Sequence, residues 1–94
     1  MVVSKNKAKF TKVIGTDGIS RSKVENDLIN INIASLFTTD TGAEVLKYLR
    51  SITIELVNGA NVSDAELRHL EGQRYLVGLI EQRIQQGHRA KNEQ

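Results

Sequence analysis

The chain has 94 residues, of which 39% are hydrophobic, four are aromatic and none is cysteine. This length suits one small domain, and the lack of cysteine excludes both a disulfide framework and thiolate ligands for a metal. No apolar run is long enough for a signal-peptide core or a transmembrane helix, so we expect a soluble chain without membrane partners. A small aliphatic core is only marginally stable alone, and association is one common remedy.

The net charge of +2 hides an uneven distribution along the chain. Residues 1–23 carry six basic side chains and one acidic one, a balance of +5, whereas residues 24–66 carry two basic and seven acidic ones, a balance of −5. Residues 67–94 have a balance of +2. A basic segment ahead of an acidic one suits an acidic protein surface, a second copy included, or nucleic-acid phosphates. Charge alone leaves both kinds of partner open.

Residues 1–20 alternate basic with small polar side chains and contain the turn signal Thr16-Asp17-Gly18. We expect a basic arm that is extended and becomes ordered only where a partner holds it. The alternation in residues 9–14 is sufficient for a short strand if a sheet edge is offered. The basic side chains of the arm that we expect to bind a partner are Lys5, Lys7, Lys9 and Lys12.

A first helix is predicted over residues 21–37, with Ser20 or Ser22 as its N-cap. Its expected buried stripe consists of Val24, Leu28, Ile31 and Leu36, helped by Ala34 and Phe37. The strict alternation of residues 28–33 is also compatible with a strand. We favour the helix because no matching strand is evident elsewhere in the sequence.

A second helix is predicted to follow, ending near Thr53. The pair Thr41 and Glu44 matches a capping box, and Thr38 or Asp40 could serve as a cap one turn earlier. Residues 54–57 either extend this helix or straighten out, and Asn58-Gly59 ends it. Its expected buried face consists of Val45, Leu46, Leu49 and Ile52.

A third, longer helix is predicted over residues 63–86, beginning with a capping box between Ser63 and Glu66. We interpret Gly72 and Gly78 as positions where another helix approaches closely, because glycine within a helix costs about 1 kcal/mol relative to alanine. The helical domain therefore spans residues 21–87, and a polar, frayed tail follows over residues 88–94. The apolar stripe consists of Leu67, Leu70, Val77, Ile80 and Ile84, widened by Leu76 and Leu79.

The polar side chains of this third helix suggest binding rather than catalysis. His69 lies one turn from Glu66, but one such pair supplies too few ligands for a metal, so we expect no metal, no cofactor and no catalytic residue. Arg68, Arg74 and Arg83 lie on or near its polar side. A row of this kind is a solvated face, a protein interface or a phosphate-binding surface.

Two blocks of the sequence resemble a known family. Residues 36–50 read LFTTDTGAEVLKYLR, and residues 66–74 read ELRHLEGQR, continuing to Ile84. These blocks are similar to small proteins of short-tailed bacteriophages that are encoded among the head and portal genes. The resemblance implies a helical structural or assembly component of the virion, made in the host cytoplasm, with no catalytic residues to carry over.

We therefore expect an all-α domain of about three helices with a long C-terminal amphipathic helix and a basic N-terminal arm. The favoured function is a non-enzymatic phage structural or assembly protein that docks on head, portal or tail components and self-associates in a ring or multicopy assembly. The face around Leu70, Val77 and Ile80 is expected to pack the domain or a neighbouring copy. The alternative is a small DNA-binding protein, a packaging or regulatory factor. The expected polar contacts at the rim of the helix face are Arg68, His69, Gln73 and Arg74.

Overall fold

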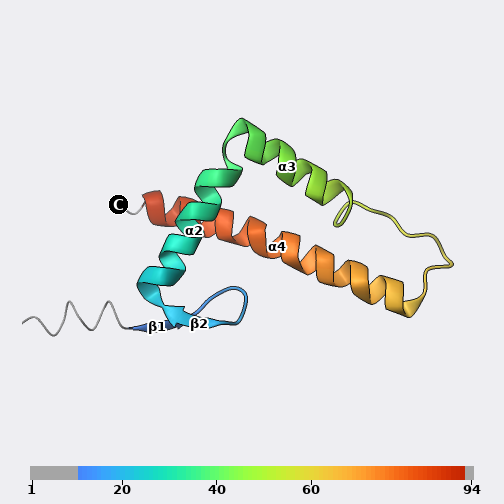
Figure 1. The fold of residues 1–94 in the computed structure, drawn as a ribbon, viewed down its shortest axis with the longest axis horizontal. Helices are drawn as coiled ribbons and strands as arrows, with labels where there is room; N and C mark the ends of the chain where they lie inside the picture. The colour runs from blue at the N-terminus through green and yellow to red at the C-terminus, as the bar shows by residue number, and fades with distance from the viewer. Residues whose placement is uncertain (1–10, 93–94) are drawn as a thin grey trace, which may run out of the picture.

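The computed structural model describes residues 11–92. Figure 1 shows α2 crossing α4, α3 leaving the end of α2, and a long loop that joins α3 to the start of α4. Three helices make residues 11–92 predominantly helical, as expected, but the β-hairpin corrects the prediction of a purely α-helical domain. The elements are β1 (Lys12–Ile14), β2 (Ser20–Ser22), α2 (Lys23–Phe37), α3 (Asp40–Ser51) and α4 (Asp64–Asn92).

The strands β1 and β2 form an antiparallel hairpin in which Val13 lies opposite Arg21. Its turn places Gly18 at a φ of 79°, a conformation that favours glycine. Residues 12–14 of the alternating segment therefore form a strand that pairs with residues 20–22, a few positions later in the chain. The hairpin takes up residues 12–20 of the predicted arm and the first two residues of the predicted first helix, which begins at Lys23 instead. Lys5, Lys7 and Lys9 lie outside the described residues.

Helix α2 confirms the helical interpretation of residues 28–33, but it buries a different face from the predicted one. Ser22 is the N-cap and accepts a hydrogen bond from the Glu25 N–H at 3.1 Å. The buried residues are Asn30 and Ala34, because α4 crosses α2 on that side. The predicted stripe is thus mostly uncovered, and the more than half-exposed side chains are Val24, Leu28 and Leu36.

Two residues separate the end of α2 from the start of α3, and this short turn decides which hydroxyl caps which helix. The Thr38 hydroxyl donates to the Ala34 carbonyl oxygen at 2.7 Å and so caps the end of α2. Thr39 is the N-cap of α3, since its hydroxyl oxygen accepts from the Gly42 N–H at 2.9 Å. The predictions of Thr41, Thr38 or Asp40 as this cap were therefore wrong. The helix ends at Ser51, two residues earlier than predicted.

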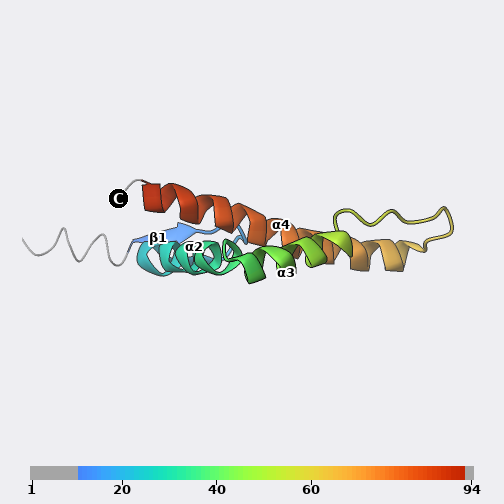
Figure 2. The same ribbon diagram turned by 90° about the horizontal axis from the view of Figure 1, so that it is seen from above.

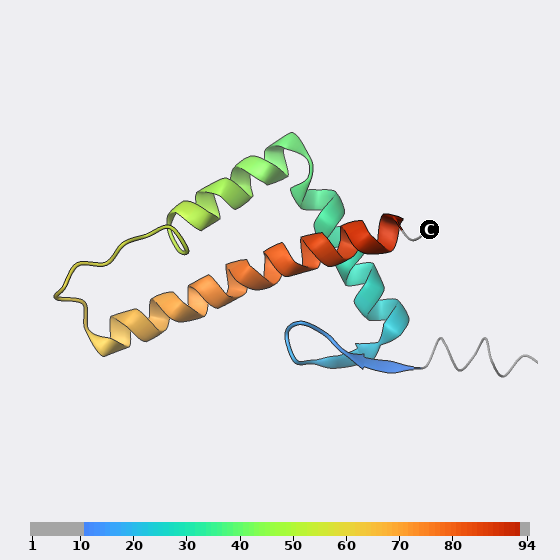
Figure 3. The same ribbon diagram turned by 180° about the vertical axis from the view of Figure 1, so that it is seen from behind.

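Helix α4 starts at the predicted capping box, where the Glu66 N–H donates to the Ser63 hydroxyl oxygen at 3.1 Å. It continues past Gly87 to Asn92, so the predicted frayed tail begins as helix. Gly87 lies within this helix against Asn30 and Ala34 of α2, where a Cβ atom would collide with both residues. Figures 2 and 3 show this crossing, with α2 and the hairpin on one side of α4. Gly72 and Gly78 face open space, so Gly87 is the position of close helix approach.

Candidate docking surface

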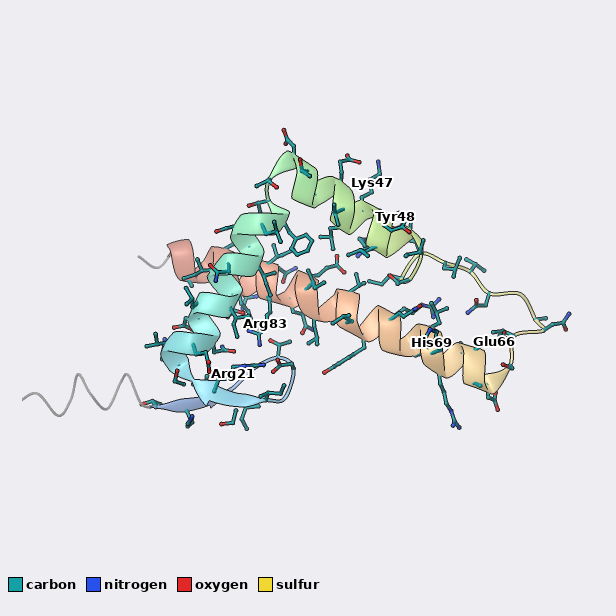
Figure 4. All side chains as sticks on the ribbon, viewed as in Figure 1. Arg21, Lys47, Tyr48, Glu66, His69 and Arg83 are labelled. Carbon is teal, nitrogen blue, oxygen red and sulfur yellow. The ribbon has the colours of Figure 1, made fainter. Side chains whose placement is uncertain are left out.

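Several of the predicted contact residues lie on exposed surface. Lys12 on β1 is exposed, as are Arg68, His69 and Gln73 on α4. The His69 Nε2 and Gln73 Nε2 atoms are 3.2 Å apart, one helical turn from each other. Figure 4 shows His69 and Glu66 near the start of α4, far from the crossing with α2. These three α4 side chains are accessible to a partner.

Arg74, in contrast, holds the chain together. Its guanidinium donates to the Thr53 carbonyl oxygen at 2.9 Å and to the Leu56 carbonyl oxygen at 2.7 Å. It also pairs with Glu71 at 2.6 Å. Because these bonds fasten the loop after α3 onto α4, Arg74 is occupied within the chain. The structure places it in this intramolecular role.

A second arginine joins α3 to α4. Arg50 pairs with Glu81 at 2.6 Å and with Glu55 at 3.2 Å. The hydrogen bonds that Arg50 donates, first to Glu81 and then to Glu55, raise the pKa of Arg50 above its ordinary value, because they favour the charged guanidinium. This basic side chain of α3 is therefore neutralised by carboxylates of the same chain.

The most buried charge in the described residues is Arg83, which the sequence placed on or near the polar side of its helix. Its side chain is 5% exposed. The guanidinium donates to Asn30 Oδ1 at 2.8 Å, to Asn26 Oδ1 at 3.1 Å and to Asp17 Oδ2 at 3.3 Å. One side chain thus links α4, α2 and the hairpin. Its position between Ile80 and Ile84 was the signal in the sequence, because apolar neighbours surround a residue that faces the interior.

Asp17 completes this polar network at its edge. Its carboxylate accepts from the Ile19 N–H at 3.0 Å and pairs with Arg21 at 2.9 Å. The Ile19 hydrogen bond, with help from Arg21 and Arg83, holds the pKa of Asp17 below its ordinary value. Figure 4 shows Arg21 and Arg83 together where the hairpin meets the helices. Polar contacts therefore fasten the hairpin in place.

The predicted face of α4 lies mainly within the molecule. Leu70 and Val77 are 6% and 4% exposed, and Ile80 is half-buried. Of the two roles expected for this face, packing its own domain is the one that the structure shows. With Ala34, these two side chains are the buried apolar residues of the described chain. Apolar contacts with a partner must therefore come from other side chains.

One row of exposed apolar side chains runs along α3 to its C-cap residue Ile52. Val45, Tyr48 and Ile52 recur at helical spacing and are 47%, 60% and 43% exposed. At the α2–α3 turn this row reaches a cup of about 170 Å³, which is called the corner cup below. The sequence assigned Val45 and Ile52 to the buried face of α3, which the structure corrects. The corner cup is lined by Leu36, Phe37, Thr39, Thr41, Gly42 and Val45.

Within residues 11–92, no three His, Asp or Glu side chains gather in a way that would hold a metal ion. No helix among the same residues is long and apolar enough to cross a membrane.

The fold and its surfaces define a small, predominantly helical protein with much of its apolar surface uncovered. The profile of the Bbp19-like phage protein family matches residues 33–92, which include α3, α4 and the last third of α2. The chain belongs to this family and is thus a bacteriophage protein. Comparisons with curated proteins and with solved structures give no significant match. The hairpin lies outside the matched residues, whereas Arg83 and the corner cup lie inside them.

Proposed function

We propose that this phage protein is a non-enzymatic structural or assembly component that docks on head, portal or tail proteins of the particle. The observation that carries the proposal is the distribution of apolar side chains. Fourteen large hydrophobic or tyrosine side chains are at least 36% exposed in the described chain, against three buried apolar ones. Soluble monomers rarely leave contiguous apolar surface open, and open patches mark contact sites.

The polar residues of the proposed interface surround apolar ones. Arg68, His69 and Gln73 are exposed next to Leu67, which is 39% exposed. In this proposal they supply hydrogen bonds at the rim of a protein contact, where polar groups fix register. Charge supports a further contact, in which the basic side chains of the arm approach an acidic partner surface. These basic side chains are Lys5, Lys7, Lys9 and Lys12.

The alternative function, a DNA-binding module, has weaker support from the helices. In a helix-turn-helix protein, α3 would be the helix that follows the short turn after α2 and enters the groove. That helix carries two acidic and two basic side chains, and its Arg50 is already paired with Glu81. Titration of duplex DNA at two salt concentrations tests this alternative, because phosphate binding weakens steeply with salt.

Mass spectrometry of purified particles and of assembly intermediates tests the proposed function. We expect the chain at a constant ratio to the portal or capsid protein across gradient fractions. A phage lacking the gene, complemented with the triple variant Arg68→Ala, His69→Ala and Gln73→Ala, should incorporate less of the chain. The variant should keep the wild-type circular dichroism spectrum, because all three side chains are exposed. Absence of the chain from particles and from all intermediates would refute the proposal.

A further inference from the structure

The corner cup has the size and lining of a socket for an aromatic ring. Its volume is about 170 Å³, and an apolar cavity of about 150 Å³ is sufficient to bind benzene. The polar side-chain atoms of its lining are the hydroxyl groups of Thr39 and Thr41. The Thr39 hydroxyl already donates to the Leu36 carbonyl oxygen and accepts from the Gly42 N–H. The Thr41 hydroxyl has no partner within residues 11–92 and is free to bind a phenol.

The cup is rigid at its base because two helices meet there without an intervening side chain. A methyl group at Gly42 would collide with the carbonyl oxygen of Leu36, so glycine allows this close approach. Thr39 caps α3 at the same point. A rigid socket loses little conformational entropy when it is filled, which favours binding.

A side chain suited to this socket is on the same face of the same helix. Tyr48 is 60% exposed, and its hydroxyl group has no hydrogen-bond partner in the described part of the chain. It lies one turn beyond Val45, which itself lines the cup. A tyrosine cannot enter the socket of its own helix from this position, but the tyrosine of an antiparallel neighbour can. A surface that carries both the knob and the socket is self-complementary, as a two-fold symmetric dimer requires.

The charges beside the row select one register for such a pair. In two antiparallel helices, a step forward on one is a step back on the other, so one pairing fixes all others. The register that sets Glu44 beside Lys47 of the second copy also brings the second copy's Tyr48 level with Ala43, next to Gly42 of the cup. By symmetry the same two contacts occur twice. Neither Glu44 nor Lys47 has an ion-pair partner within residues 11–92.

We propose that the occupant of the corner cup is Tyr48 of a second copy of this chain, held by antiparallel pairing of α3 with α3. The inference rests on the docking role proposed above and names the partner of its α3 face. The tyrosine ring fills the cup, its hydroxyl group donates to Thr41, and Glu44 pairs with Lys47 across the two-fold axis. Surface ion pairs add little affinity, but they discriminate against other registers.

Sedimentation velocity of the full chain over a concentration series up to millimolar tests the role of Tyr48 in the proposed dimer. Tyr48→Ala should raise the dimer Kd about 10- to 30-fold, because buried aromatic anchors dominate interface energies. Tyr75→Ala is the matched control, since Tyr75 on α4 is 58% exposed and lies away from the cup. Its Kd should stay within about twofold of the wild-type value. Circular dichroism verifies that both variants remain folded.

Two charge reversals test the register at low salt. Glu44→Lys and Lys47→Glu should each weaken self-association, because each places like charges opposite each other. A mixture of the two single variants should form a heterodimer in which all pairs across the axis are opposite in charge. The Kd of this heterodimer should be within about threefold of the wild-type value. At high salt the heterodimer should no longer bind more tightly than the homodimers of the single variants, because salt screens the charges. A mixture that associates no better than either variant alone would overturn the proposal.

A chain that stays monomeric at millimolar concentration, or a dimer insensitive to Tyr48→Ala, would equally overturn the inference. If that chain still enters particles at a constant ratio, the proposed function stands and only the identity of the occupant fails. A dimer that loses affinity with Tyr48→Ala in a chain absent from all particles would support the inference and refute the virion role. The two failures are therefore distinguishable.

Discussion

Replacing Arg83 with methionine removes the charge that joins the hairpin to both crossing helices. Methionine keeps most of the apolar stem of the arginine, so the expected loss is that of the guanidinium and its hydrogen bonds. Three acceptors lose their donor, on Asn30, Asn26 and Asp17. Asn30 is 5% exposed, and water cannot easily replace the lost bond there.

The magnitude follows from these contacts. A hydrogen bond to a charged group contributes about 1.5–3 kcal/mol, and leaving a buried acceptor unpaired costs about 1–3 kcal/mol. Asp17 keeps Arg21, and the variant no longer desolvates a buried guanidinium, so the terms do not simply add. We expect Arg83→Met to lower the free energy of unfolding by about 3 kcal/mol. For a chain of this size, that lowers Tm by roughly 12–24 °C.

Urea denaturation followed by far-UV circular dichroism measures this loss. Arg68→Met is the control, because Arg68 is an exposed arginine of the same helix and has no partner in the described chain. It should change the free energy by at most about 0.5 kcal/mol. The double variant Arg83→Met and Asp17→Asn should lose less free energy of unfolding than the sum of the two single variants, because both changes break the same Arg83–Asp17 contact. A loss under about 1 kcal/mol for Arg83→Met would refute the reasoning.

Three further perturbations test the remaining contacts. Gly87→Ala adds a methyl group against the Asn30 carbonyl oxygen and should cost about 1–3 kcal/mol in a thermal melt, whereas Gly72→Ala, in open space on the same helix, should stabilise by up to about 1 kcal/mol. Equal effects of the two changes would contradict the observed crossing. Folding lowers the pKa of Asp17, so its carboxylate stabilises the fold above its ordinary pKa of 3.8, and this stabilisation is lost as the pH falls through the pKa of the folded state. The urea midpoints of wild type and Asp17→Asn should therefore converge below pH 3.8. A difference between the midpoints that widens below pH 3.8 would contradict a lowered pKa. Ser63→Ala should cost about 0.5–2 kcal/mol through loss of the α4 cap, measured by urea denaturation, and no change would show that the cap contributes nothing.

The sequence predicted the helices more accurately than the faces they bury. Local signals placed the cap of α4 at Ser63 and that of α2 at Ser20 or Ser22, of which the structure uses Ser22, because a serine hydroxyl satisfies the first N–H groups within one turn. The cap of α3 was missed because two helices share one short turn, and Thr38 serves the preceding helix. That division depends on both helices at once.

The exposure of the proposed contact residues was predicted only in part. Arg68, His69 and Gln73 are exposed, as a polar position on an amphipathic helix suggests. Helical spacing groups the apolar residues of α3 but does not tell which of them face the rest of the molecule. Val45 was therefore assigned to the interior although it lines the corner cup. Arg74 binds the loop after α3, and the residues next to Arg74 in the sequence do not predict this contact, because its partner Thr53 lies 21 positions away.

The sequence by itself determined that the chain is small, mostly helical and without cysteine chemistry, because composition, spacing and capping act over a few residues. Only the tertiary structure decided that Arg83 is an interior group, that Gly87 rather than Gly72 lies at the helix crossing, and that Tyr48 faces outward. The first two outcomes depend on where α4 passes α2, which brings together residues more than fifty positions apart. Burial is a property of that crossing: a local pattern such as Arg83 between Ile80 and Ile84 indicates an inward position but not what packs against it.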